Sequence, residues 1–184
     1  AKTNYSTRSS AYLENQKQME PIRIFIGFDK IEAVAFSVLA HSIHERSSRP
    51  VSITPITLAN LKDVYWRTRD PKQSTDFSFS RFLVPYLCDY RGWAIWMDCD
   101  MLCRGDIVNL WNKRELFTSV QVIKHDYTPR GTTKFLGYEQ HPYAKKNLSS
   151  VMLFHCAHYH CRRLTPEYVN SASGLMLHQF GWSE

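Results

Sequence analysis

The sequence predicts an α/β fold in which a mostly parallel sheet carries helices on both faces. Short apolar, β-branched and aromatic runs occupy residues 22–28, 51–58 and 93–98, a pattern typical of buried strands. Residues 32–46, between the first two runs, space their apolar side chains as a helix does. Strand, helix and strand in succession favour parallel pairing with the helix packed on the sheet.

Two helical segments are expected in the first half of the chain. In residues 32–46 the predicted buried stripe consists of Val34, Ala35, Val38, Leu39 and Ser42. Residues 59–76 are polar and rich in turn formers, so we expect a surface excursion there. Residues 78–90 again show helical spacing, and Pro85 inside them is expected to kink or break the helix.

The segments after the third strand alternate in the same way. Asp106 is a candidate N-cap for a helical turn over 105–111. Residues 116–123 alternate like a strand, and 124–147 form a predicted long loop rich in Gly, Pro, Lys, Tyr and Thr. Residues 150–156 predict another buried strand.

The last predicted element is a helix over 165–180, which opens with the start signal Thr165–Pro166. Residues 1–20 are polar and without periodicity, so we expect a flexible lead-in to one domain spanning 21–184.

Composition narrows the class of protein. With 43% hydrophobic and 22% charged residues, the chain has the profile of an ordinary globular domain, and no apolar run reaches membrane-spanning length. The net charge of +6 suits an anionic partner, but its scatter along the chain argues against nucleic acid. Five cysteines, an odd number, favour reduced thiols and a cytoplasmic location.

Two carboxylates stand directly at the end of the third strand. Asp98 and Asp100 are two positions apart, so as strand residues they point the same way. At the carboxyl end of a parallel sheet that direction faces the crevice where ligands bind. Their oxygens suit Mn²⁺ or Mg²⁺, with substrate phosphates completing the coordination.

The segment STDFSFSRFLVPYLCDYRGWAIWMDCDMLCRGDIVNLW, residues 74–111, resembles the central signature of family-8-type glycosyltransferases of the GT-A fold. Residues 22–30, 146–156 and 164–180 resemble the first strand, an acceptor-side strand and a C-terminal helix of those enzymes. The resemblance covers about residues 22–182. It implies a metal-dependent, retaining hexosyltransferase that moves a sugar from a nucleotide-diphosphate donor, with UDP favoured, to a hydroxyl of a carbohydrate or glycan acceptor.

Carried over to this sequence, the resemblance assigns roles to single residues. Asp98 and Asp100 would hold the metal ion, and Asp98 would also contact the ribose. Gly27, Phe28 and Asp29 would surround the base and ribose. Arg81 would reach the donor sugar or phosphate, and Gln179 would lie near the reacting anomeric centre. Residues 124–150 would line the acceptor side.

The chain also departs from the family pattern. Asn147 lies one position out of register, and His178 stands where the family has an Asp. The family continues to a His that completes the metal site and a Lys that grips the diphosphate, and neither has a counterpart here. This leaves open a domain truncated at its C-terminus, a divergent relative with a weaker metal site, or a catalytically inactive nucleotide-sugar-binding module.

Two further interpretations fit less well. A nucleotidyltransferase would need a Gly-rich basic loop after the first strand, where residues 27–30 read Gly-Phe-Asp-Lys. The run HCAHYHC, residues 155–161, suggests zinc but lacks C-x2-C spacing, so we expect a His- and Cys-rich loop. Cys99, between the two aspartates, is expected to point into the core.

Overall fold

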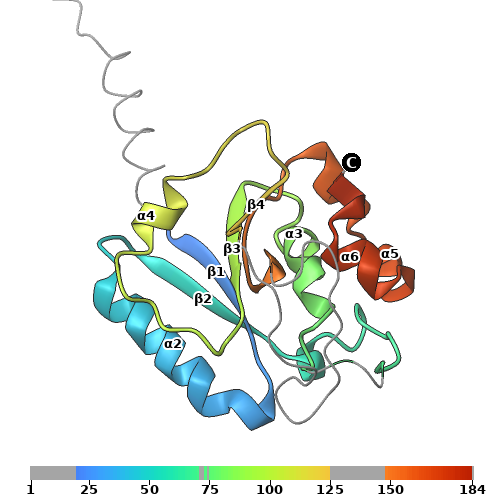
Figure 1. The fold of residues 1–184 in the computed structure, drawn as a ribbon, viewed down its shortest axis with the longest axis horizontal. Coiled ribbons are helices and arrows are strands. Elements are labelled where there is room, and N and C mark those ends of the chain that lie inside the picture. Colours follow the sequence, from blue (N-terminus) through green and yellow to red (C-terminus); the bar gives the residue numbers. More distant parts are fainter. Residues whose placement is uncertain (1–19, 71–72, 74, 125–147, 184) are drawn as a thin grey trace, which may run out of the picture.

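The computed structural model describes residues 20–70, 73, 75–124 and 148–183, and these form one five-stranded sheet flanked by helices (Figure 1). The strands are β1 (Ile22–Gly27), β2 (Val51–Ile56), β3 (Trp93–Met97), β4 (Val120–Val122) and β5 (Val151–His155). Their order is β2-β1-β3-β5-β4. Strand β5 runs opposite to the other four, so its pairs with β3 and β4 are antiparallel, whereas β1 pairs parallel with β2 and β3. The predicted α/β class with a mostly parallel sheet is confirmed.

Both faces of the sheet are covered. Ile24 pairs with Ile95 on one face and Phe25 with Trp96 on the other, and all four side chains are at most 7% exposed. The strands lie between α2 (Ala33–Arg46) and a group of shorter helices (Figure 1). That group contains α3 (Val84–Leu87), α5 (Pro166–Ser171) and α6 (Gly174–His178). Because the strands are buried on both faces, their sequences are continuous apolar runs rather than alternating apolar and polar residues.

Helix α2 forms where it was predicted, but its buried face differs from the expected one. Leu39, Ser42 and Ile43 are buried, whereas Val34 is 78% and Val38 48% exposed. The prediction for the two valines was wrong because apolar residues occupy adjacent stripes of this helix, and spacing alone does not say which stripe faces the sheet. The Ser42 hydroxyl has partners inside: it donates to the Leu39 carbonyl and accepts from the Cys103 N–H.

Proline and short polar side chains set the ends of the small helices. Pro85 lies in the first turn of α3 and separates it from a 3-10 turn, as its missing N–H requires. Asp106 accepts a hydrogen bond from the Val108 N–H at the start of α4 (Val108–Trp111). The 3-10 turns are η1 (Lys30–Glu32), η2 (Leu58–Asn60), η3 (Ser80–Leu83), η5 (Leu148–Ser150), η6 (Tyr159–Arg163) and η7 (Gly181–Ser183).

The single helix predicted over 165–180 was wrong, because two helices occupy this range. Thr165 caps α5 as expected, accepting from the Tyr168 N–H. Ala172 is extended (φ −63°, ψ 148°), and the Ser173 hydroxyl accepts from the Met176 N–H to start α6. The extended Ala172 therefore ends α5, and the Ser173 cap starts a separate helix.

Other expectations are met in part. Strand β4 is shorter than the predicted 116–123. In the predicted surface segment 59–76, most of the described residues up to 70 are exposed or half-buried, but Leu61 and Tyr65 are buried. All five cysteines are buried free thiols, as their odd number predicted; the cytoplasmic location stays a prediction.

Within the described ranges, no helix has the length and apolar character to cross a bilayer. The expected lead-in (1–19) and long loop (125–147) lie outside the described residues.

Gly27 at the end of β1 should tolerate no side chain. A Cβ there would lie 2.4 Å from Cγ of the buried Phe77 ring. We expect Gly27→Ala to lower the free energy of unfolding by about 1–3 kcal/mol, measured by urea denaturation, because the ring must shift in a packed core. Gly105→Ala is the matched control, since nothing lies within 4 Å of its Cβ position. Equal stabilities for the two variants would contradict the prediction.

Candidate functional site

The candidate site lies at the edge of the sheet where β1 and β3 both end. These strands are parallel neighbours, so Asp29, which follows β1, and Asp98, which follows β3, emerge at the same edge. The Asp98 N–H donates to the Ser150 carbonyl at 2.9 Å, which joins this edge to the start of β5. Three separate parts of the sequence therefore converge at the predicted ligand crevice.

Arg81 and Asp98, two of the predicted site residues, form an ion pair. Arg81 Nη1 lies 2.8 Å from Asp98 Oδ1, and the two side chains are only 7% and 16% exposed. The same guanidinium donates to the carbonyls of Ser149 and Phe77, at 2.9 and 3.2 Å. It also lies over the rings of Phe77 and Trp96, at 5.6 and 5.3 Å from their centroids. Its Nε and Nη1 atoms and its planar face thus have partners in the protein.

Negative charge accumulates at this edge beyond what Arg81 balances. Burial raises the pKa of Asp98, and the charge of Asp100 adds to this while Arg81 opposes it. Burial also raises the pKa of Glu32, which feels Asp100, Asp29 and Asp98 together. Four carboxyl groups from η1 and two strand ends therefore share one electrostatic environment.

This donor set fits a hard divalent cation. Carboxylate oxygens are preferred ligands of Mg²⁺ and Mn²⁺. Burial is the main cause of the raised pKa of Asp98, and a cation would offset both the burial of its charge and the smaller effect of Asp100. In the part of the chain that the structure describes, no three or more His, Cys, Asp or Glu side chains are grouped to hold a metal by themselves. Asp98 and Asp100 would consequently share the ion with ligand oxygens, as is usual for Mg²⁺.

The residues after β1 are held mainly by backbone groups. Both oxygens of the Asp29 carboxylate accept hydrogen bonds at 3.1 Å, one from the Ile31 N–H and one from the Asp76 N–H. Phe28 packs edge-on against Phe36 of α2, with ring centroids 5.5 Å apart. Asp29 therefore connects the end of β1 to the segment that leads into η3. The predicted roles of Gly27, Phe28 and Asp29 toward a nucleotide stay predictions.

Cys99 lies in the core, as predicted, although its thiol contacts one of the carboxyl groups at this edge. It is fully buried, and its Sγ donates to Glu32 Oε2 at 3.5 Å. Burial and the neighbouring Glu32 raise the pKa of the Cys99 thiol to about 12, so it is protonated near neutral pH. Glu32 was not predicted as a site residue, because 66 residues separate it from Asp98 and no local pattern connects them.

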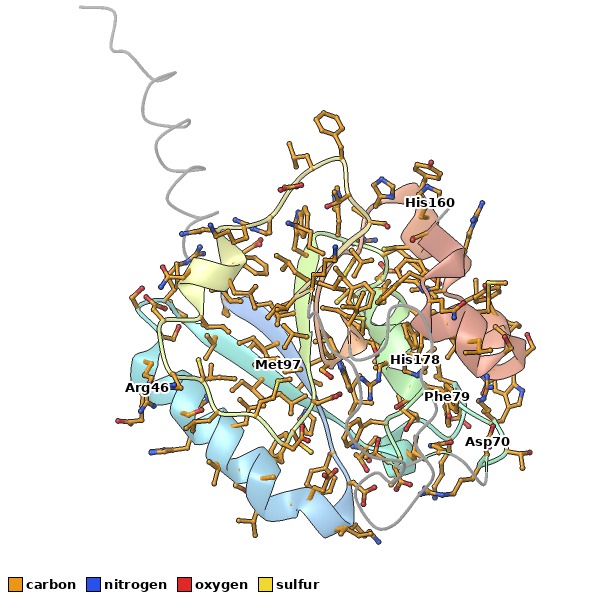
Figure 2. All side chains as sticks on the ribbon, viewed as in Figure 1. Arg46, Asp70, Phe79, Met97, His160 and His178 are labelled. Carbon is orange, nitrogen blue, oxygen red and sulfur yellow. The ribbon has the colours of Figure 1, made fainter. Side chains whose placement is uncertain are left out.

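His178 and Ser149 were also missed as partners of the site. Ser149 Oγ lies 2.8 Å from His178 Nδ1, and the imidazole ring packs against Phe79 and Phe82 with centroids 5.8 and 5.2 Å apart (Figure 2). Since the Ser149 carbonyl accepts from Arg81, His178 is linked to the ion pair through one residue.

Gln179 directly follows α6, and its N–H donates to the Leu175 carbonyl at 2.8 Å. This places its backbone at the end of the helix that carries His178. The predicted catalytic role of Gln179 near an anomeric centre stays a prediction.

The His- and Cys-rich run 155–161 serves packing. Cys156 and Cys161 are fully buried. His155 stacks on Trp93 with centroids 4.3 Å apart and planes 3° from parallel, and the rings of residues 158–160 contact one another. The run is thus an aromatic surface around two buried thiols.

Comparison with solved structures defines the class of fold. The chain is similar to the WbbM bifunctional glycosyltransferase, with a TM-score of 0.50 and 14% identity over 74% of this chain, and it spans about a third (31%) of WbbM. Mouse xyloside xylosyltransferase 1 gives a TM-score of 0.49 and 12% identity, covering 82% of this chain and 74% of that one. The fold is that of GT-A glycosyltransferases.

The particular family follows from sequence. The chain is 44% identical over 184 residues to Protein CDI of Arabidopsis thaliana, which covers 99% of this chain and 71% of that protein. It therefore belongs to the family of Protein CDI. No family profile matches the chain.

The Arg81–Asp98 ion pair should be strongly coupled. We expect Arg81→Met to lower the free energy of unfolding by about 3 kcal/mol, because Asp98 then stays buried without its counter-charge. The Arg81→Met/Asp98→Asn double variant should lose less than the sum of the single losses, by about 1–3 kcal/mol, in a urea double-mutant cycle. The exposed pair Arg91–Asp89, 2.9 Å apart, is the control and should couple by less than about 1 kcal/mol. Additive losses at Arg81 and Asp98 would refute the prediction.

His155 should make stability depend on pH. Burial and the nearby His158 lower the pKa of His155 in the folded protein. As the pH falls, His155 is therefore protonated in the unfolded chain before it is protonated in the folded protein. The free energy of unfolding should consequently fall as the pH drops through about 6.5. His155→Phe, which keeps the ring on Trp93, should show a smaller fall between about pH 7.5 and 5. His41→Gln, on the exposed side of α2, should follow the wild type; identical profiles for all three proteins would contradict this.

Proposed function

We propose that this chain is a metal-dependent glycosyltransferase that moves a sugar from a nucleotide-diphosphate donor, UDP-sugar favoured, to a hydroxyl of a carbohydrate acceptor. One observation carries the proposal: Asp98 and Asp100 follow the central strand β3 of a glycosyltransferase-like sheet, at the edge where β1 also ends. The accumulated carboxyl charge there suits a cation, and a cation suits a diphosphate.

On this proposal Asp98 and Asp100 would hold Mn²⁺ or Mg²⁺ beside the donor phosphates. The bound ion would supply Lewis-acid stabilisation of the departing nucleoside diphosphate, without proton transfer. Arg81 is fixed by Asp98, Ser149 and Phe77, so it contributes a positive charge whose position is set before the donor binds.

The donor's base and ribose are assigned to the end of β1. Gly27 and Phe28 would border the base, and Asp29 would face the ribose, its carboxylate already oriented by two backbone N–H groups. Gln179, next to His178 at the end of α6, is proposed to lie near the anomeric centre. His178 stands where family-8-type enzymes carry an Asp, so any carboxylate role of that position is absent here.

The resemblance to family-8-type glycosyltransferases supports retention of the anomeric configuration. NMR of the first-formed product, before mutarotation, reads the configuration directly. The acceptor side proposed for residues 124–150 falls largely outside the described residues.

A second candidate function is a nucleotide-sugar-binding module without transferase activity. Two observations favour it: the Arg81 guanidinium is already engaged by three protein groups, and the described residues offer no third protein ligand grouped with the aspartates. Calorimetry that detects UDP binding, together with chromatography that finds neither sugar transfer nor donor hydrolysis, would select this function over the enzyme.

Donor binding should require the cation and Asp100. We expect UDP or a UDP-sugar to raise the melting temperature in the presence of Mn²⁺ and to have little effect with EDTA, because binding to the native state stabilises it. Asp100→Asn should abolish the Mn²⁺-dependent shift without unfolding the protein, since Asp100 is exposed. The exposed Asp63→Asn is the matched control and should behave as the wild type. A full shift in Asp100→Asn would exclude the proposed metal site.

A further inference from the structure

A charged cavity lies at the opposite edge of the sheet from the candidate donor site. The parallel strands β1, β2 and β3 begin there, and β1 alone separates the two edges by six residues, roughly 20 Å. Figure 1 shows α4 beside the start of β1 at this edge. The cavity has a volume of about 170 Å³, and its charged and aromatic lining residues are Glu20, Arg23, Arg49, Trp93, Trp111 and Arg114.

The local structure aims Arg23 at this cavity. Its Nε donates to the Trp93 carbonyl at 3.1 Å, and Nη2 donates to the Arg91 carbonyl. Gly92 makes room for it: with φ +62°, this residue is in the left-handed region, and a Cβ would lie 2.8 Å from Arg23 Nη2. The turn before β3 is therefore shaped around a guanidinium.

Arg114 reaches the cavity from the segment after α4. Its Nε donates to the Trp111 carbonyl at 2.7 Å, and its guanidinium lies 4.2 Å from the centroid of the Trp111 ring. These contacts hold the planar group at a fixed orientation and leave further N–H donors for a ligand, since a guanidinium carries five.

Positive charge exceeds negative charge in the lining. Three arginines face it and Glu20 is the one carboxylate among its described lining residues. Arg23 and Arg114 donate to backbone carbonyls, and neither forms an ion pair with a carboxylate in the described ranges. Burial and the charge of Arg49 lower the pKa of Arg114, which agrees with two guanidinium groups held close together.

We propose that this cavity binds a phosphate group, either inorganic phosphate or the phosphoryl end of a small phosphomonoester. A phosphate offers several charged oxygens to converging guanidinium groups, which bind it through paired hydrogen bonds. The volume suits a single phosphoryl group with little attached, and the Trp93 and Trp111 rings bound it with apolar surface. Because it lies at the other edge of the sheet, the site is independent of donor binding at Asp98 and Asp100.

Calorimetric titration of the full chain with inorganic phosphate and, separately, with glucose 6-phosphate tests the proposal at constant ionic strength. We expect saturable binding of at least one of them. Arg114→Gln should weaken it roughly tenfold or more, because it removes charged donors to the anion. Arg49→Gln is a second variant, to be used if circular dichroism shows that Arg114→Gln folds poorly. Arg49 contacts other protein groups than Arg114 does, so the two variants need not share a folding defect. Arg162→Gln, which removes an exposed charge on η6, should bind as the wild type.

The two titrants distinguish the source of the phosphate. Binding of glucose 6-phosphate alone assigns the site to a phosphomonoester, and binding of inorganic phosphate alone assigns it to the free ion. Asp100→Asn should leave both titrations unchanged, which separates this site from the donor site. The proposal is overturned if neither titrant binds saturably, or if Arg114→Gln and Arg49→Gln both fold and bind as tightly as Arg162→Gln.

Discussion

The buried ion pair between Arg81 and Asp98 is the interaction on which the candidate site depends. Arg81 comes from η3, yet its guanidinium holds the end of β3 through Asp98 and the start of β5 through the Ser149 carbonyl. Removing both charges from water costs free energy, which the pair offsets only with good geometry and additional hydrogen bonds. The carbonyls of Phe77 and Ser149 accept such hydrogen bonds from Arg81, and the Trp96 ring adds a cation–π contact. The edge of the sheet is therefore organised by the protein before any ligand arrives.

That pairing also divides the roles of the two aspartates. Asp98 is mostly buried and carries a guanidinium, whereas Asp100 is exposed. A cation at this edge would meet one carboxylate of fixed position and one that is free to adjust. Glu32 accepts a hydrogen bond from the Cys99 thiol and feels the charges of both aspartates. A cysteine between the aspartates thus attaches the loop to η1 and keeps its own sulfur in the core, which explains why an apolar residue type fits there.

The sequence predicted the elements whose burial produces a continuous local pattern. It did not predict the features that depend on contacts between distant segments. Strands β1, β3 and β5 are buried on both faces, so each is a short apolar run that can be recognised directly. The buried face of α2 and the break at Ser173 depend on which neighbour a helix meets, and spacing does not contain that information. The family resemblance assigned Arg81 and Asp98 to one site. It did not predict that they form an ion pair, or that Ser149 links Arg81 to His178, because these contacts join residues far apart in the sequence.

Dispersed charge in a sequence does not mean dispersed charge in space. The basic residues form no long block, which argued against nucleic acid, yet Arg23, Arg49 and Arg114 meet at one cavity. Parallel strands make this possible, because their starts gather at one edge and their ends at the other. Asp29 and Asp98 gather at the carboxyl edge by the same geometry. The strand direction of the sheet therefore separates an anionic edge, suited to a cation, from a cationic edge, suited to an anion. The net charge of +6 is a sum over the whole chain and does not reveal this separation.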